Sequence, residues 1–162
     1  MRNIICISAL ALATAVQAAD GPPLGCYQRA YSAEHLAANP AQIVDEISLK
    51  IHIQAIYGEI IGDMRVWFAD QGRVAGTVNA GRVLDQFLIC WGDETRSGCS
   101  VECDGGSFQV TKADPNGLTF ETDYLLVGET EDCGGAEDLA EILGQPVKYR
   151  LNRVDDAVCD GL

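Results

Sequence analysis

The sequence has few basic side chains: 11 Lys and Arg stand against 24 Asp and Glu, which gives a net charge of −13. Nucleic acids and anionic membrane surfaces would repel such a chain, so we exclude both as partners. Internal repeats and low-complexity segments are absent as well. The length of 162 residues and a hydrophobic content of 48% predict a single globular domain.

Motifs of catalysis and metal binding are also missing. The chain contains no P-loop, no G-x-S-x-G, no H-E-x-x-H and no C-x-x-C. Histidine occurs twice: His35 lies in a predicted short helix, and His52 lies on the polar face of a predicted strand. We interpret His52 as a solvated strand residue, so the sequence assigns no catalytic residue.

Long apolar runs are absent after the first 18 residues, which are themselves predicted to be a signal peptide. Arg2 precedes a thirteen-residue apolar stretch, Ile4 to Val16, which is too short to span a bilayer. Small residues at Val16 and Ala18 predict cleavage before Ala19. The mature chain, residues 19–162, is therefore expected to be a soluble secreted or periplasmic protein without a membrane span.

Seven cysteines are present, and Cys6 would be lost with the signal peptide. The remaining six predict a disulfide framework, because an even number in an exported chain is typical of paired thiols. Cys99-x-x-x-Cys103 also has the spacing of half a metal site, but an oxidising compartment favours disulfides. The expected order of the strands predicts the pairs Cys90–Cys99, Cys103–Cys133 and Cys26–Cys159.

Alternation of apolar and polar residues is clearest from Ile47 to Ile56, where nine of ten positions fit a strand with one buried face and Ile56 is the exception. Seven more segments complete an antiparallel meander of about eight strands: Met64 to Ala69, Arg73 to Asn79, Arg82 to Trp91, Cys99 to Cys103, Ser107 to Lys112, Leu118 to Val127 and Pro146 to Val154. The fold class is therefore all-β. A small closed barrel is the predicted architecture, with a two-sheet sandwich as the alternative.

Two short helices are predicted beside these strands. Ser32 can cap a helix over Ala33–Ala38, which Pro40 must end. A second helix is predicted over Ala136–Leu143, because Glu137 and Asp138 would favour its start and Gly144 its end.

The acidic second half and the aromatic residues supply the candidate sites. Calcium prefers carboxylate oxygens, which loops can supply, and the candidate ligands are Asp104, Glu129, Glu131 and Asp132, although no EF-hand spacing is present. No other cofactor is indicated. Trp67, Trp91 and Tyr57 are the candidate ligand contacts, since aromatic rings offer stacking surfaces for a sugar or another ligand.

These observations predict an exported, non-enzymatic β-domain that binds a small ligand or a protein partner. Two alternatives remain open. One is a hydrolase that uses a pair of loop carboxylates. The other is an inhibitor of an exported enzyme that presents a disulfide-pinned loop such as Gly92 to Gly98.

Overall fold

The computed structural model of the chain describes residues 21–130 and 135–162, which form an all-β domain. The predicted signal peptide lies outside these residues. The described elements are β1 (Gly25–Ala30), α1 (Ala33–Ala38), β2 (Val44–Ile53), β3 (Ile60–Phe68), η1 (Gly72–Val74), β4 (Val83–Gly92), β5 (Ser97–Ser100), β6 (Gly106–Asp114), β7 (Gly117–Glu129), β8 (Gly135–Asp138), β9 (Val147–Val154) and η2 (Asp156–Cys159).

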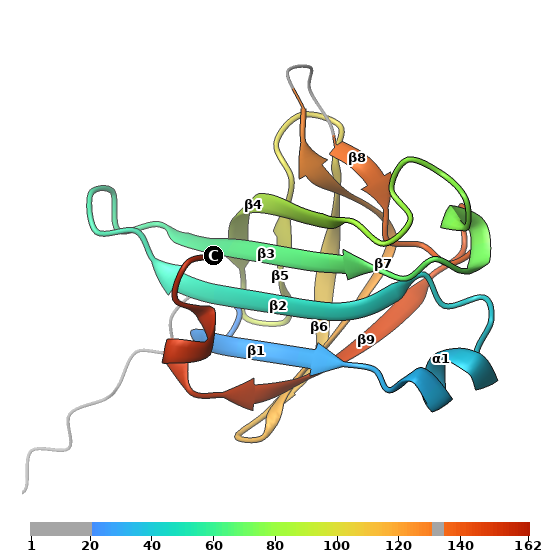
Figure 1. Cartoon of the computed structure of the whole chain (residues 1–162). Coiled ribbons are helices and arrows are strands. Elements are labelled where there is room, and N and C mark those ends of the chain that lie inside the picture. The colour runs from blue at the N-terminus through green and yellow to red at the C-terminus, as the bar shows by residue number, and fades with distance from the viewer. Residues whose placement is uncertain (1–20, 131–134) are drawn as a thin grey trace, which may run out of the picture.

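Eight of the described strands close into an antiparallel barrel (Figure 1). The hydrogen-bonded order is β6-β5-β4-β3-β2-β1-β9-β7, and a further pairing of β6 with β7 joins the two ends. The ninth strand, β8, pairs with the end of β7 outside the barrel. The predicted closed barrel is confirmed. The sandwich alternative is excluded, because the pairing of β6 with β7 joins the two ends of the sheet and closes it.

An apolar cluster occupies the interior of the barrel. In β2 the inward positions Ile47, Leu49 and Ile51 are at most 1% exposed, as the alternation predicts. Phe120 contacts the rings of Phe108 and Tyr149 at centroid distances of 4.6 and 5.4 Å. A barrel of eight strands has an interior just wide enough for side chains to fill, and here the large apolar residues occupy it.

The predicted strand over Arg73 to Asn79 is wrong. This segment forms the 3₁₀ helix η1 followed by turns, within the connection of residues 69–82 between β3 and β4. Gly72 and Gly76 adopt positive φ values of 58° and 68°, which an extended strand does not allow. A Cβ atom at Gly72 would stand 2.7 Å from the carbonyl oxygen of Ala41, so glycine is required there.

The predicted helix over Ala136–Leu143 is wrong as well, whereas the predicted helix over Ala33–Ala38 is confirmed as α1. The chain forms β8 at Gly135–Asp138, and Leu139 and Ala140 are fully buried after it. A helix of two turns is marginal in water, whereas the extended chain gains backbone pairing with β7 and burial of both residues. Tertiary contacts therefore override a weak local preference.

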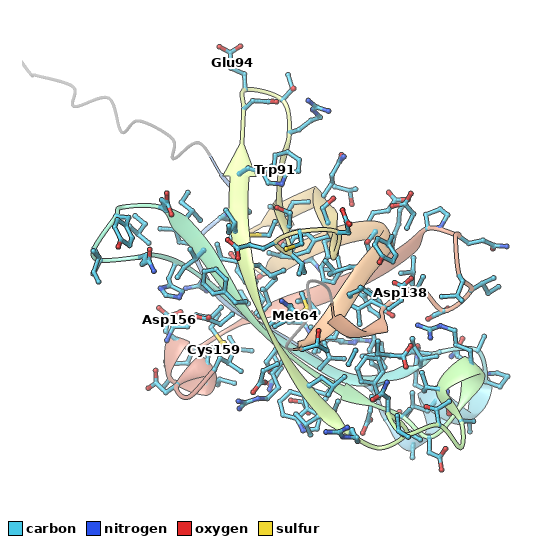
Figure 2. The ribbon with its side chains drawn as sticks, turned by 90° about the horizontal axis from the view of Figure 1, so that it is seen from above. Met64, Trp91, Glu94, Asp138, Asp156 and Cys159 are labelled. Carbon is cyan, nitrogen blue, oxygen red and sulfur yellow. A yellow bond between two sulfur atoms is a disulfide. The ribbon has the colours of Figure 1, made fainter. Side chains whose placement is uncertain are left out.

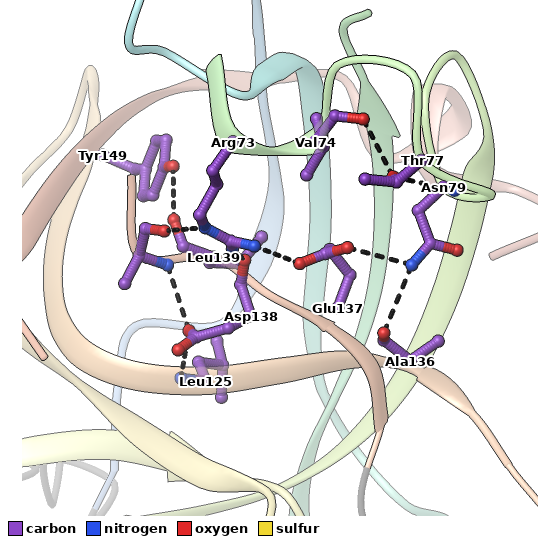
Figure 3. Close-up of polar contacts among 11 residues, drawn as sticks. Arg73, Val74, Thr77, Asn79, Leu125, Ala136, Glu137, Asp138, Leu139 and Tyr149 are labelled. Carbon is purple, nitrogen blue, oxygen red and sulfur yellow. Dashed lines mark hydrogen bonds and ion pairs between the residues drawn. The ribbon is translucent and has the colours of Figure 1, made fainter. Parts of the chain in front are cut away.

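Alternate carbonyls of β8 and its continuation lie on the edge that faces away from β7. Asn79 Nδ2 donates to the carbonyl of Ala136 at 3.2 Å, while Arg73 donates to the carbonyls of Asp138 and, at 2.7 Å, Ala140 (Figure 3). Side chains from residues 69–82, the connection that we call the strap, thus take the place of a neighbouring strand. This arrangement protects an edge that would otherwise be free to pair with another chain.

Further polar contacts fix this end of the barrel, which we call the strap rim and which carries α1, residues 69–82 and β8. Glu137 accepts from Arg73 and, at 2.9 Å, from Asn79 Nδ2. The hydroxyl of Tyr149 donates to the carbonyl of Leu139 at 2.9 Å, and burial raises the pKa of Tyr149 well above its usual value. These contacts join residues 69–82 to β8, and β9 to the segment that follows β8 (Figure 3).

Two of the three predicted disulfides, Cys90–Cys99 and Cys26–Cys159, are confirmed. The predicted strand from Cys99 to Cys103 is shorter, because β5 ends at Ser100 and Cys103 adopts a turn conformation with a φ of 59°. Cys103 is disulfide-bonded, but its predicted partner Cys133 lies outside the described residues, so that pairing stays a prediction. Two disulfides indicate an oxidising, extracellular or periplasmic setting. Among the described residues, no helix is long and apolar enough to cross a bilayer.

Candidate functional site

Two hairpin connections, residues 54–59 and 93–96, project from the end of the barrel opposite the strap, and we call this end the hairpin rim (Figures 1 and 2). It is one end because the antiparallel register places Ile53, Ile60 and the end of β4 on the same side of the barrel. Figure 2 shows the two hairpins extending away from the barrel in different directions. The two hairpins are therefore separate projections of this rim.

The β2–β3 hairpin ends in an ordered turn. The amide of Gln54 donates to the carbonyl of Glu59 at 2.8 Å, and the amide of Gly58 donates to the carbonyl of Gln54 at 2.9 Å. Gly58 has a φ of 72°, a conformation that glycine adopts without strain. Backbone hydrogen bonds therefore hold this tip in place without any contribution from the barrel core.

Large apolar side chains are exposed on this turn. Ile56 is 80% exposed and Tyr57 is 73% exposed, and Ile53 at the end of β2 is 50% exposed. Burying a side chain of this size is worth about 1.5–3 kcal/mol, a gain that neither tip residue makes within the chain. Two neighbouring large apolar residues on a projecting turn are typical of anchors that a binding partner buries.

The β4–β5 hairpin is a narrow ribbon cross-linked at its base. Cys90 pairs with Cys99 in the register, whereas β4 pairs with β3 only as far as Ile89. From Cys90 to Gly92 the ribbon therefore extends past β3 while remaining paired with β5. The disulfide holds the two strands together where this support from β3 ends.

Asp93 organises the tip of this ribbon. One of its carboxylate oxygens accepts hydrogen bonds from the Thr95 amide, the Thr95 hydroxyl and the Arg96 amide at 2.8–2.9 Å. The Asp93 amide donates to the carbonyl of Arg96 at 2.8 Å. The Thr95 amide, together with the other donors, lowers the pKa of Asp93 to about 2. Glu94 stands at the apex of this preformed turn (Figure 2).

Trp91 lies on the outer face of the ribbon, close to its base (Figure 2). A Cβ atom at Gly98, its cross-strand partner, would stand 3.0 Å from the indole, so the absence of a side chain at Gly98 leaves room for the ring. Ile89, two residues earlier on the same face, is 38% exposed. Trp91 and Ile89 thus continue apolar surface from the ribbon onto the barrel wall.

The three aromatic residues predicted as ligand contacts do not form one site. Tyr57 and Trp91 both lie at the hairpin rim. Trp67 pairs with Val83 at the start of β4, eight residues from Trp91, which corresponds to about 26 Å along the strand. Sequence reasoning missed Ile56, although this residue was the one misfit in an otherwise regular alternation.

The two histidines make local contacts. His52 Nε2 lies 2.7 Å from Asp63 Oδ2 on the outer face of β2 and β3, where both side chains remain partly solvated. His35 Nε2 lies 2.9 Å from Gln42 Oε1 beside α1. These contacts tie neighbouring segments together, in agreement with the interpretation of His52 as a strand residue facing solvent.

Two of the four predicted calcium ligands lie within the described residues, and they belong to different segments. Asp104 lies in the β5–β6 connection and Glu129 ends β7, whereas Glu131 and Asp132 lie outside the described residues. Within the described part of the chain, no group of three or more His, Cys, Asp or Glu side chains has the arrangement of a metal site. Calcium binding stays a prediction from the sequence.

Comparison with known proteins adds no constraint to this picture. The interpretation of the hairpin rim therefore depends on its own residues and their geometry. No family model matches the chain, and no curated protein or solved structure matches it either.

Proposed function

We propose that this protein is an exported, non-enzymatic binding domain that engages a protein partner through the hairpin rim. The predicted signal peptide over residues 1–18 and the disulfides support export. N-terminal sequencing of the mature protein tests this part, with Ala19 as the expected first residue. An N-terminus at Met1 would contradict it.

The exposure of Ile56 and Tyr57 is the observation that carries the proposal. A turn needs no large apolar residues, and a polar pair would leave the hairpin equally well hydrogen-bonded. Interfaces gain most of their free energy from a few aromatic or apolar anchors that become fully buried on binding. The apolar cluster inside the barrel favours a partner at the surface over a small ligand in the lumen.

Rigidity of the second hairpin supports the same proposal. The Cys90–Cys99 bridge and the hydrogen bonds of Asp93 fix the ribbon before any partner arrives. A preformed loop loses little conformational entropy on binding, which increases affinity without new contacts. A narrow ribbon with Glu94 at its apex also fits the alternative in which the partner is an exported enzyme and the ribbon enters its active-site cleft.

Site-specific photo-crosslinking in the producing cell tests the proposal. A benzophenone amino acid at position 57 is expected to give a protein adduct of discrete mass, and the substitution Ile56→Ser in the same chain should reduce its yield at least fivefold. The matched control is the same photoreactive residue at position 78, because Val78 is 82% exposed but lies at the strap rim. Both positions are exposed, so the melting temperature should not change.

Two results would overturn the proposal. One is an equal adduct pattern from positions 57 and 78. The other is the absence of any protein adduct in cells, combined with binding of the purified protein to phosphatidylcholine vesicles. If Ile56→Ser abolished that vesicle binding, the hairpin would be a membrane anchor. The alternative in which the partner is an enzyme is tested with the Glu94→Lys variant. If the apex enters the active-site cleft, this variant should inhibit the captured enzyme less strongly than the wild-type protein does.

A further inference from the structure

A polar groove lies on the outer face of the barrel, away from the hairpin rim's two tips. It has a volume of about 320 Å³ and runs over β6 and β7, with the segment before β9 as its wall. Its lining residues are Ser107, Gln109, Thr111, Glu121, Thr122, Asp123, Gly144 and Pro146. Pockets for small molecules occupy about 300–1,000 Å³, so this volume suits a ligand of one or two rings.

Several lining groups are used by the fold itself. The Thr122 hydroxyl donates to the carbonyl of Ser107 at 2.8 Å and accepts from the amide of Tyr124 at 3.1 Å. The carboxylate of Glu121 forms an ion pair with Lys148 at 3.4 Å. These contacts shape the groove and hold its floor in a fixed position.

Three other groups face the groove with their hydrogen-bonding capacity available to a ligand. They are the hydroxyl of Ser107, the amide of Gln109 and the carboxylate of Asp123, none of which bonds to another described side chain or backbone group. Together they provide hydroxyl and amide donors and hydroxyl, amide and carboxylate acceptors. This mixed set is complementary to neighbouring hydroxyl groups, each of which donates one hydrogen bond and accepts others.

An aromatic ring stands beside these polar groups. Tyr124 is the cross-strand partner of Ser107, so both side chains lie on the outer face, and Tyr124 is 42% exposed. The ring of Tyr124 lies against Gly106, at the end of the groove marked by Ser107. A pyranose ring has an edge of hydroxyls, which the polar groups of the groove match, and an apolar face of C–H groups, for which the adjoining Tyr124 ring is the counterpart. Anionic ligands are disfavoured by the carboxylates of the groove and by the net charge of −13.

We propose that this groove binds a neutral saccharide of one or two pyranose rings. The proposal is independent of the protein-binding role of the hairpin rim, because the two surfaces share no residue. Gln109 and Asp123 would bind the hydroxyl edge, and Tyr124 would stack on the face of the ring.

Titration of the ¹⁵N-labelled protein with maltose, cellobiose and N,N′-diacetylchitobiose tests the assignment. At least one of them is expected to shift the amide signals of Ser107, Gln109 and Gly144, with a dissociation constant in the millimolar range. Gln109→Ala and Asp123→Ala should each weaken binding at least fivefold. Glu34→Ala, which changes an exposed carboxylate in α1, should leave the dissociation constant unchanged.

Three outcomes would overturn the proposal. The first is the absence of any localised shift with all three saccharides at 50 mM. The second is an unchanged affinity in both groove variants. The third is tighter binding of putrescine than of every saccharide, which would show that Asp123 and Glu121 attract a cation instead.

Discussion

The two ends of the barrel are held by different means. At the strap rim, Arg73, Asn79 and Tyr149 satisfy the backbone carbonyls of a buried segment, and their own side chains are largely enclosed. At the hairpin rim, a disulfide and the local hydrogen bonds of Asp93 hold the chain, and the tip side chains stay in solvent. The comparison teaches that one end uses its polar residues for stability, whereas the other keeps its side chains available for binding.

The largest expected effect comes from removing the central side chain of the strap. Arg73→Met would leave the carbonyls of Asp138 and Ala140 without this donor and the carboxylate of Glu137 without its ionic partner, with Asn79 as its remaining donor. The side chains of Arg73 and Glu137 are only 23% and 13% exposed. We expect the free energy of unfolding to fall by about 3–4 kcal/mol, measured by urea denaturation.

Arg82→Met is the matched control for this substitution, because Arg82 belongs to the same connection but is exposed. It should change the free energy of unfolding by less than about 0.5 kcal/mol. Equal losses from the two variants would mean that the Arg73 contacts do not stabilise the strap rim.

A smaller effect is expected from removing the disulfide at the base of the β4–β5 hairpin. The double substitution Cys90→Ser and Cys99→Ser opens a ring whose cysteines are nine positions apart. The chain-entropy relation predicts that the free energy of unfolding falls by about 2.7 kcal/mol. The ribbon beyond β3 should also open more often, so trypsin should cleave after Arg96 faster than in the wild-type protein.

The rate of tryptic cleavage after Arg82 serves as the internal reference, since the strap rim contains no part of this disulfide. If cleavage at both sites became faster to the same degree, the variant would have lost stability throughout the protein. The disulfide would then not stabilise the ribbon locally.

The smallest effect concerns the charge of Asp93. Because its pKa is lowered to about 2 from the ordinary 3.8, the carboxylate contributes to the order of the tip above about pH 4. This contribution is lost as the pH falls through the folded-state pKa. NMR titration should show the Thr95 and Arg96 amide signals moving with a midpoint near pH 2. In Asp93→Asn the same signals should cease to titrate, and a wild-type midpoint near 3.8 would contradict the hydrogen bonding of Asp93 to these amides.

Much of the fold is predictable because a half-buried strand carries a period of two. This period identifies β2, where the inside is apolar and the outside is polar. It fails for β1, because Tyr27 is buried inside the barrel and Cys26 is buried outside it beneath η2. The expected count of eight barrel strands was correct only because the missed strand β1 offset the wrong strand over Arg73 to Asn79.

The candidate site is less predictable than the fold. Residue type alone pointed to Tyr57 and Trp91, but it also pointed to Trp67, which lies at the far end of the strands. The exposure of Ile56 depends on where β2 ends, and that end is set by the backbone hydrogen bonds of Gln54 and Gly58. Such a boundary is a property of the turn, and the hydrophobic pattern does not contain it.

Closure of the barrel by the first and last strands has a consequence for how the chain folds. Cys26 pairs with Val154 in the register, and the disulfide to Cys159 spans a sequence separation of 133 residues. Contacts of this range form slowly, and β1 has no second neighbour until β9 has been synthesised. Until then, the growing chain carries an open strand edge. Oxidation of Cys26 with Cys159 therefore marks the moment at which the last edge disappears, so the appearance of this bond reports the completion of folding.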